Sequence, residues 1–388
     1  MLPQKFDIVA TTLPGLEPLL RRELLHEGLF IAREGVRSFT VIGNKEILYR
    51  LNLKSRFALR FLVPVLSFRA THPDELYKKV RRFEWEKFFG TDDTFAIDSV
   101  VNSDIFRNSR FITYRCKDGI VDRFARDFGK RPDVDTENPV CRIHLHIRDE
   151  FVNISLDSSG SSLHLRGYRE QSHPAPLNEV LAAGLVAMSG YTGHVPLVDG
   201  MCGSGTLAIE AAMMASQTAP GLVRKNYGFM SWSDFDQKLY SGILGDLKNA
   251  VAPPTHPIKA IDRNGAFVRM AQQHAATAGV ADFIQFERND FLRFEPELPE
   301  GILLLNPPYG NRLDDDTEEL YAAIGARLKH HYAGWKAWII SANPEAMHQI
   351  GLKPMKKHKL KNGALDCEYR GYELFAGKRA DKVRSNAQ

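Results

Sequence analysis

One stretch of the sequence restricts the possible folds more than any other, residues 194–215, which read HVPLVDGMCGSGTLAIEAAMMA. An apolar run ends at Asp199, a glycine-rich turn follows, and apolar residues then recur at helical spacing. A strand, such a turn and a helix are typical of nucleotide-type cofactor sites in doubly wound α/β sheets. There the glycines let a ligand approach the backbone, and the helix N-terminus favours a negative group. We therefore expect an α/β domain that binds a cofactor at this turn.

The details of the turn indicate which cofactor. No lysine precedes Thr206, so the turn is not a phosphate-binding P-loop. Met201 stands where a dinucleotide fingerprint would have its first glycine. A strand-end acid followed by Gly203, Ser204 and Gly205 fits S-adenosylmethionine better, because that molecule carries a sulfonium cation and a carboxylate but no pyrophosphate.

Two later strands supply further acids. Residues 256–264 place Asp262 at a strand end, where it would hold ribose hydroxyls, and residues 282–291 end near Asp290, which would accept a hydrogen bond from the adenine amino group. Asp262 lies 63 residues beyond Asp199, further than in a minimal unit, because residues 219–242 form an insertion rich in aromatic and basic residues. This insertion could be a lid, an RNA contact or a cover for the sheet edge.

The fourth strand leads into the sequence ILLLNPPYGN at residues 302–311. Its end places Asn306 beside the expected methyl donor, because ligands of such sheets lie outside the carboxyl ends of the strands. The Asn306 side-chain oxygen and a carbonyl of Pro307 or Pro308 can each accept a hydrogen bond from an amine. Tyr309 offers a flat face for stacking. This loop suits methylation of a planar amine, mainly by positioning it, without a strong base.

The N-terminal part predicts two α+β modules. Residues 5–68 follow the ferredoxin-like order β-α-β-β-α-β, with Asn44 as a helix N-cap. In the second segment we expect helices over 74–90 and 114–129 and strands over 94–101 and 142–159. Residues 1–170 hold 28 Lys and Arg against 24 Asp and Glu, so the whole net charge of +4 lies here. That surplus fits a polyanion-binding module and an ordinary solvated surface equally well.

Two basic stretches are candidates for RNA contact. Residues 103–111 interleave arginines with Phe106 and Phe111, a pattern that suits phosphate contact and base stacking but also a polar loop beside core aromatics. Residues 353–363 hold five lysines and a histidine within nine positions, which fits either salt-dependent phosphate contact or a solvated hairpin.

The remaining composition excludes several classes of protein. No stretch of the 388 residues approaches the ~18–20 apolar residues of a membrane span. The N-terminus lacks the basic and apolar segments of a signal peptide, so we expect a cytoplasmic protein. The four cysteines lie far apart, which predicts neither a disulfide framework nor a zinc site, and we expect no metal.

Several motifs occur in a specific order along the chain: FRNSRF, KDGIVDRF, LHLRGYR, PLNEVLAAGL, MCGSGTLAIEAAMMA, APGLVR, NPPYGNRL and KNGALDC. In these motifs, from about Phe6 to Lys378, the chain resembles the THUMP-domain class I RNA methyltransferases. It is most similar to the guanine-N2 methyltransferase half of the bacterial bifunctional 23S ribosomal RNA methyltransferase and to its stand-alone relatives. The resemblance implies a ferredoxin-like domain (1–69), a THUMP RNA-binding domain (70–160) and a Rossmann-like methyltransferase domain (161–388).

The resemblance also implies S-adenosylmethionine as donor, the N2 amine of a guanine in RNA as acceptor, and a role for each matching residue. The amine-binding loop would be Asn306, Pro307, Pro308 and Tyr309. The donor site would comprise Pro176, Leu177, Glu179, Asp199, Cys202, Gly203, Ser204, Gly205, Thr206, Asp262 and Asp290. Gly200 departs from the family pattern, since many relatives have proline there. The chain ends where the bifunctional enzymes add a second methyltransferase domain, so we expect a single activity.

Other substrates remain open at this stage. The same chemistry serves tRNA, since THUMP proteins act on both kinds of RNA, and the same loop would accept the amide of a protein glutamine. The basic N-terminal part argues against a small protein target, and no DNA-reading module supports DNA adenine methylation. A non-catalytic RNA-binding assembly factor is disfavoured because every expected site residue is present.

Overall fold

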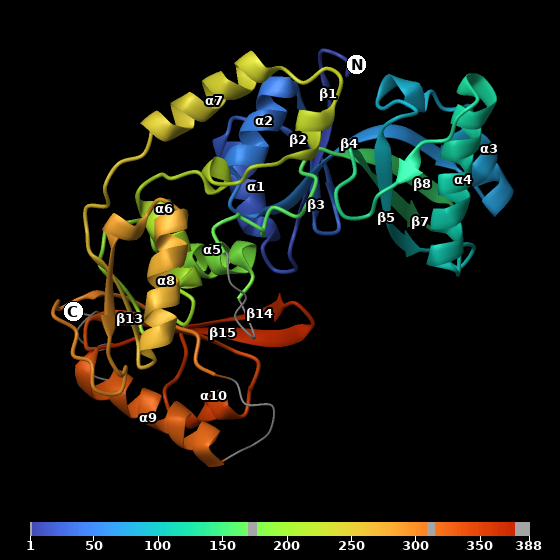
Figure 1. The fold of residues 1–388 in the computed structure, drawn as a ribbon. Coiled ribbons are helices and arrows are strands. Elements are labelled where there is room, and N and C mark those ends of the chain that lie inside the picture. Colours follow the sequence, from blue (N-terminus) through green and yellow to red (C-terminus); the bar gives the residue numbers. More distant parts are fainter. Residues whose placement is uncertain (1, 170–176, 309–314, 377–388) are drawn as a thin grey trace. The chain divides into compact units, whose positions relative to one another are not determined.

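The computed structural model describes residues 2–169, 177–308 and 315–376, so Pro176 and Tyr309 lie outside the described residues. By contacts the chain divides into two compact units, each of which is discontinuous in sequence. The first unit comprises residues 1–12, 21–163 and 224–246, and the second comprises residues 13–20, 164–223 and 247–388. Figure 1 shows the elements of both units, most of them labelled.

The first unit is built on one mixed sheet of eight strands in the order β2-β3-β1-β4-β8-β7-β5-β6. The long strand β4 pairs with β1 through its first half and with β8 through its second half, which makes the sheet continuous. The elements are β1 (Phe6–Thr12), α1 (Glu17–His26), β2 (Ile31–Gly35), β3 (Ser38–Gly43), α2 (Lys45–Lys54), β4 (Ala58–Arg69), α3 (Pro73–Arg82), η1 (Trp85–Lys87), β5 (Thr94–Asn102), α4 (Ser109–Phe128), β6 (Asp133–Val134), β7 (Cys141–Arg148) and β8 (Phe151–Asp157).

The order of elements in the first module agrees with the predicted β-α-β-β-α-β pattern. The Asn44 side chain accepts the N–H of Ile47 at 3.0 Å, so the predicted N-cap is confirmed. The helix expected over 74–90 is wrong in length, because α3 ends at Arg82 and only a short 3-10 turn follows, from which the Trp85 indole donates to the Val80 carbonyl. The intervening Phe83 has extended backbone angles, which stop the helix.

Residues 103–111 do not form only a loop. Asn108 caps α4, which begins at Ser109, and the Asn108 side chain accepts the N–H of Phe111. Phe106 is buried, whereas Phe111 is 48% exposed on the first turn of the helix. Basic and aromatic side chains are thus presented by a helix N-terminus.

The second unit contains a seven-stranded sheet in the order β11-β10-β9-β12-β13-β15-β14. The pairings among β11, β10, β9, β12 and β13 are parallel, and those of β13 with β15 and β15 with β14 are antiparallel. The elements are α5 (Glu179–Met188), β9 (Leu197–Asp199), α6 (Thr206–Ala215), η2 (Pro220–Leu222), β10 (Ile258–Asp262), α8 (Gly265–Thr277), η4 (Ala281–Phe283), β11 (Ile284–Arg288), β12 (Gly301–Leu305), α9 (Asp315–His331), β13 (Trp335–Ser341), α10 (Ala346–Gln349), β14 (Lys356–Asn362) and β15 (Leu365–Glu373).

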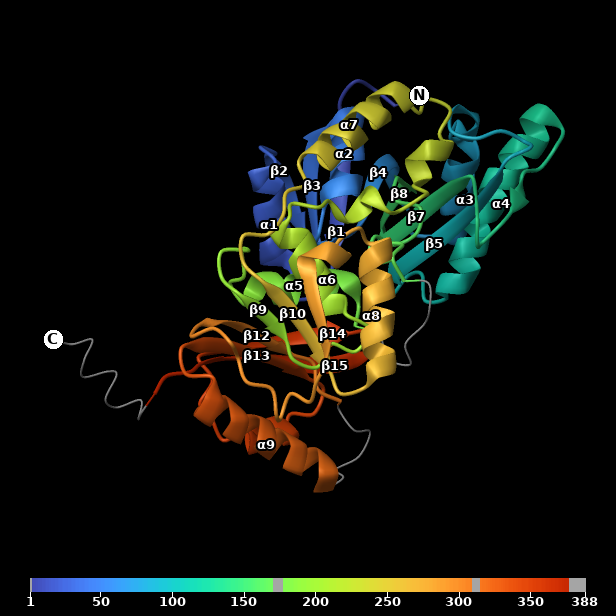
Figure 2. The ribbon, with the colours of Figure 1, turned by 60° about the vertical axis from the view of Figure 1, so that its left-hand side comes forward.

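Helices cover both faces of this sheet. Figure 2 shows α5, α6 and α8 on one face and α9 on the other. On the α9 face, the buried side chains of Tyr321, Ile324 and Leu328 pack against Leu303 and Ile339 of the central strands. The order of the strands reverses between β9 and β12, so a switch point of the kind that binds ligands lies between them.

The insertion after α6 does not remain with the second unit. Its middle part, residues 224–246 with η3 (Gly228–Ser231) and the first turns of α7 (Gln237–Asn249), belongs to the first unit. There the ring of Phe229 stacks on that of Tyr49 in α2, with centroids 4.4 Å apart, and Tyr240 lies 6.4 Å from Tyr49. The aromatic residues that mark the insertion in the sequence therefore form a core with the ferredoxin-like module.

Candidate functional site

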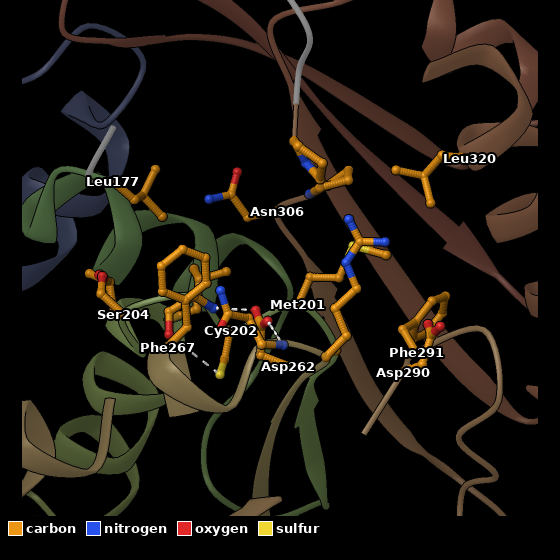
Figure 3. A pocket seen from close by; sticks show the side chains of 18 of the residues that line it. Leu177, Met201, Cys202, Ser204, Asp262, Phe267, Asp290, Phe291, Asn306 and Leu320 are labelled. Carbon is orange, nitrogen blue, oxygen red and sulfur yellow. Dashed lines mark hydrogen bonds between the residues drawn. The ribbon is translucent and has the colours of Figure 1, made fainter. Parts of the chain in front are cut away.

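A pocket of about 480 Å³ opens at the carboxyl ends of the parallel strands of the second unit. Most of its residues follow β9, β10, β11 and β12, the four strands around the switch point. Figure 3 shows Asn306 above Asp262, with Leu177 on one side and Leu320 on the other. Ten of the residues predicted for the site line this pocket: Leu177, Cys202, Gly203, Ser204, Thr206, Asp262, Asp290, Asn306, Pro307 and Pro308.

The glycine-rich turn after β9 is shaped by two glycines with left-handed backbone angles, Gly203 at φ 51° and Gly205 at φ 83°. A Cβ at Gly203 would meet no atom within 4 Å, so this residue borders open space in the pocket. A Cβ at Gly205 would lie 2.7 Å from the side chain of Ala271, so this glycine lets α6 approach α8. The first glycine thus leaves space open in the pocket, and the second allows close packing of two helices.

Asp262 is the last residue of β10, and at the floor of the pocket its side chain connects β10 to the turn that follows β9. Its carboxylate accepts the N–H of Gly203 at 3.0 Å and the N–H of Asn264 at 2.8 Å. The side chain is therefore fixed by backbone donors from both sides while it still lines the cavity. Such a carboxylate has lone pairs left for hydroxyl groups of a ligand.

Asp290 follows β11 in the same way. Its Oδ1 accepts the N–H of Leu292 at 3.0 Å, which holds the carboxylate at the pocket wall. Asn306, Pro307 and Pro308 leave the carboxyl end of β12, whose five residues are all buried. The strand thus delivers a polar side chain and two prolines to the same cavity as the two acids.

Asp199 is not among the residues that line the pocket. The side chain is fully buried, and its Oδ2 accepts the N–H of Ala208 at 3.2 Å in the first turns of α6. Burial raises its pKa to about 7, with the nearby Asp262 carboxylate adding to the effect. Asp199 therefore contacts the first turns of the helix that begins at the glycine-rich turn, and so supports that turn.

Glu179 is also buried away from the cavity. Its Oε1 forms an ion pair with the Arg169 guanidinium at 3.2 Å. Burial raises the pKa of Glu179 to about 7, against the opposing effect of Arg169. Arg169 donates in addition to the Leu177 carbonyl and to the Thr206 hydroxyl. This arginine therefore connects the segment before α5 with the start of α6, two parts of the pocket wall.

The sequence motifs did not indicate every residue of the pocket. Phe267 lies one turn into α8, Leu292 follows Asp290, and Leu320 comes from α9. The position of Phe267 after a strand-end acid and a helix cap could have suggested it, whereas Leu320 gives no local signal. The apolar wall is completed by Met201 and Phe291.

Cys202 is the only cysteine among the described pocket residues, and burial raises its pKa well above the usual value. It is therefore a neutral thiol rather than a nucleophile. Within the described ranges no group of His, Cys, Asp and Glu could hold a metal ion, and no helix is long and apolar enough to cross a membrane. The residues that line the pocket include two carboxylates and an amide, which are groups that bind hydroxyls and amines.

Together, the sheet order, the glycine-rich turn and the strand-end acids define a Rossmann-like α/β domain with a cofactor-sized pocket at its switch point. Family profiles match in three regions: the RMKL-like methyltransferase domain over residues 166–371, the THUMP domain over 70–157 and the RlmL ferredoxin-like domain over 7–62. The first match covers more than half of the chain, and the chain therefore belongs to the RMKL-like methyltransferase family. These matches confirm the resemblance and the fold class inferred from the sequence.

Individual relatives agree with this assignment. The chain is 38% identical over 385 residues to the ribosomal RNA large subunit methyltransferase K/L of Syntrophotalea carbinolica. The match covers 96% of this chain and 54% of that protein, so the chain spans about half the length of this curated relative.

Solved structures extend the likeness to nearly the whole chain. A possible methylase from Clostridium difficile 630 has 28% identity and a TM-score of 0.86, covering 97% of this chain and 100% of that one. A methyltransferase candidate complexed with SAH has 28% identity and a TM-score of 0.84, with the same coverage. A predicted N6-adenine-specific DNA methylase from Listeria monocytogenes has 27% identity and a TM-score of 0.84, covering 95% of this chain and 96% of that one.

Proposed function

We propose that the chain transfers a methyl group from S-adenosylmethionine to the exocyclic N2 amine of a guanine in 23S ribosomal RNA. The observation that carries this proposal is the meeting of Asn306 and Pro307 with Asp262 and Asp290 in one pocket. An amine-accepting loop and the acids expected for a nucleoside cofactor line the same cavity. The relative from Syntrophotalea carbinolica is named for the large subunit RNA, and one solved relative binds SAH.

The pocket residues fit the proposed cofactor. Asp262 would accept hydrogen bonds from the ribose hydroxyls, and Asp290 would accept one from the adenine amino group. The open space at Gly203 and the N-terminus of α6 would take the amino-acid end of the cofactor. When bound, S-adenosylmethionine supplies an electrophilic methyl group on a positively charged sulfur.

The acceptor loop would act mainly by orientation. The side-chain oxygen of Asn306 and the carbonyl of Pro307 would accept the two hydrogens of the guanine amine and direct its lone pair at the methyl group. As the N–CH3 bond forms and the S–CH3 bond breaks, the nitrogen becomes tetrahedral and positive, and these two acceptors stabilise the charge that develops on it. S-adenosylhomocysteine is left, and the methylated amine then loses a proton to water. We propose that Tyr309, outside the described residues, stacks on the base.

The N-terminal unit favours RNA as the substrate. It contains the THUMP match, and α4 presents the exposed side chains of Arg110, Phe111 and Tyr114 in its first turns, with the exposed Arg107 just before the Asn108 cap. The guanidinium of Arg110 lies 5.7 Å from the centre of the Tyr114 ring. Cations beside exposed rings suit phosphates and unstacked bases. Methylation of the N2 amine requires an unstacked base, so a loop or bulge is the expected target.

The test uses the full chain with labelled S-adenosylmethionine and, in separate reactions, unmodified 23S ribosomal RNA and bulk tRNA. Mass spectrometry of the digested RNA should find N2-methylguanosine in the 23S RNA. Label in tRNA alone would replace the proposed substrate by tRNA, and N6-methyladenosine would contradict the proposed acceptor.

Asn306→Ala tests the role of the acceptor loop. We expect the rate of methyl transfer to fall about 10²–10³-fold, as for loss of a positioned group at a developing charge. The dissociation constant of S-adenosylhomocysteine, measured by calorimetry, should change less than about twofold, because the Asp262 and Asp290 side chains remain in place. A variant that methylates at the normal rate would refute the mechanism.

A further inference from the structure

The hairpin of β14 and β15 reaches the same edge of the sheet as the pocket. Because β15 is antiparallel to both β13 and β14, strand β14 runs in the same direction as β12 and β13. The turn that follows β14 therefore lies at the carboxyl edge of the sheet, where Asn306 follows β12. Figure 1 shows β14 and β15 as a hairpin beside the other strands of this unit.

The strand register shows how far the hairpin extends. Leu305 is paired with Ile339, Ile339 with Arg370, and Arg370 with Lys357. Asn306, one residue further, is thus level with His358. The last four residues of β14, 359–362, continue beyond that level by about 13 Å, at ~3.3 Å per residue. Three strand spacings, about 14 Å, separate β14 from β12. The hairpin stands beside the mouth of the pocket and projects past it.

The projecting part of β14 is positively charged and exposed. Lys359 and Lys361 are both exposed, and alternation places them on one face of the strand, opposite His358 and the buried Leu360. Lys361 forms an ion pair with Asp366 at 2.8 Å in which both side chains are exposed, and such a pair is weak enough to exchange for a phosphate. Both lysines are thus exposed just beyond the level of the pocket mouth.

The acid paired with Lys359 across the hairpin is already engaged. Glu368 is opposite Lys359 in the register, and its carboxylate forms an ion pair with Arg370 at 2.6 Å. Among the described residues Lys359 has no ion-pair partner within 4.0 Å. A phosphate at this position would meet a cation that forms no ion pair with any carboxylate in the described part of the chain.

Protection of an edge strand explains these lysines less well. Lysines on an outermost strand can prevent pairing with another sheet. At Lys359, however, another part of the chain already lies against the edge, since a Cβ at Gly15 would be 3.3 Å from the Lys359 carbonyl oxygen and 2.7 Å from the Leu360 side chain. At Lys359 the chain itself lies against the edge strand, so a charge is not needed there to prevent pairing with another sheet.

The end of β14 is also linked to the wall of the pocket. The Asn362 side-chain oxygen accepts the N–H of Asn178 at 3.3 Å. Asn178 caps α5, and the preceding residue, Leu177, lines the pocket. A strand of RNA that crosses the hairpin would therefore pass next to the residues that border the cofactor site.

We propose that Lys359 and Lys361 bind the phosphates that flank the target guanine and so hold its strand at the pocket mouth. This inference rests on the proposed function, since it concerns the RNA whose base enters that pocket. The lysines position the substrate and take no part in the chemistry. The three strand spacings between the hairpin and Asn306 leave room for the nucleotide that carries the base.

The experiment compares the full-length wild type with the double variant Lys359→Gln/Lys361→Gln. The matched control is Lys329→Gln/Lys336→Gln, which removes two exposed lysines at the opposite, amino edge of the sheet. The probe is unmodified 23S ribosomal RNA. For each protein we would measure the KM and kcat for this RNA, the dependence of RNA binding on salt, and the affinity for S-adenosylhomocysteine.

For the hairpin variant we expect the KM for RNA to rise at least tenfold with kcat nearly unchanged. The slope of log K against log salt should become shallower by about 1.4, which is two contacts at ~0.7 each for single strands. S-adenosylhomocysteine should bind as in the wild type, and the control variant should keep the wild-type KM and slope. The variant Lys359→Arg/Lys361→Arg should retain most of the RNA affinity.

An unchanged KM and salt slope in the hairpin variant would overturn this inference, and so would an equal loss in the control variant. A failure of the proposed function can be distinguished from this, because the wild type itself would then form no N2-methylguanosine in the RNA. If the wild type methylates the RNA and the hairpin variant does so equally well, only the assignment of the lysines is wrong.

Discussion

At the scale of single residues, Asp262 is the side chain on which cofactor binding should depend most. It holds the backbone of Gly203 and Asn264 and lines the cavity. In Asp262→Ala we expect the affinity for S-adenosylhomocysteine to fall about tenfold to hundredfold, since hydrogen bonds to a charged group contribute roughly 1.5–3 kcal/mol. Calorimetric titration measures this change. The control is Asp282→Ala, at an exposed position before β11, and equal losses in both variants would contradict the assignment.

Asp199 should make stability depend on pH. Burial raises its pKa to about 7 in the folded chain, whereas an unfolded Asp titrates near pH 4. The folded state therefore holds more protons between these values, and the free energy of unfolding falls as the pH rises through this range.

The variant Asp199→Asn removes this contribution while its side-chain oxygen can still accept the N–H of Ala208. From about pH 5 to pH 8 the wild type should lose on the order of 2 kcal/mol more than the variant. Urea unfolding of the cofactor-free proteins measures the difference. Glu179 titrates in both proteins and cancels in the comparison. Parallel pH profiles would show that Asp199 is ionised in the folded state.

At the scale of elements, residues 224–246 offer a matched pair of glycines. A Cβ at Gly228 would lie 2.2 Å from the Asp157 carbonyl oxygen, whereas one at Gly242 in α7 would meet nothing within 4 Å. We expect Gly228→Ala to destabilise the first unit by about 1–3 kcal/mol through backbone overlap. Gly242→Ala should stabilise α7 by about 0.5–1 kcal/mol.

Urea unfolding and the rate of tryptic cleavage at Lys225 would measure both changes. Faster cleavage in the Gly228 variant alone would show that the segment has loosened from the sheet. If the Gly228 variant were as stable as the wild type, the close approach between Gly228 and Asp157 would not contribute to the fold.

The elements and the candidate site differ in how far the sequence predicts them. The strands, the helices and the strand-end acids Asp262 and Asp290 follow local sequence patterns. Both acids line the pocket, as predicted from their positions at strand ends. Leu320 reaches the pocket from α9, and Arg169 pairs with Glu179, through contacts that no local pattern encodes. The prediction of one helix over 74–90 was wrong for the opposite reason. Apolar residues continue at helical spacing beyond Phe83, but the extended backbone of Phe83 ends the helix.

At the scale of the whole molecule, neither unit is one continuous piece of chain. The first unit includes residues 224–246, although in the sequence these residues lie between two parts of the second unit, residues 164–223 and 247–388. Within this unit Arg224 donates hydrogen bonds to the carbonyls of Ser159 and Ser161, and Phe229, which is fully buried, stacks on Tyr49. The sequence predicted the insertion but not its location, because packing against residues some 180 positions away leaves no local signal.

A fragment of residues 1–163 should therefore be an incomplete domain. Without Phe229 and its neighbours the ring of Tyr49 is uncovered, and loss of such a buried aromatic contact costs about 3–5 kcal/mol. We expect this fragment to bind a hydrophobic dye and to melt at a lower temperature than the same fragment joined to residues 224–246 by a glycine–serine linker. Thermal unfolding of the two fragments measures the effect. Equal melting temperatures would mean that the N-terminal unit is complete without the insertion, and that these residues only rest on its surface.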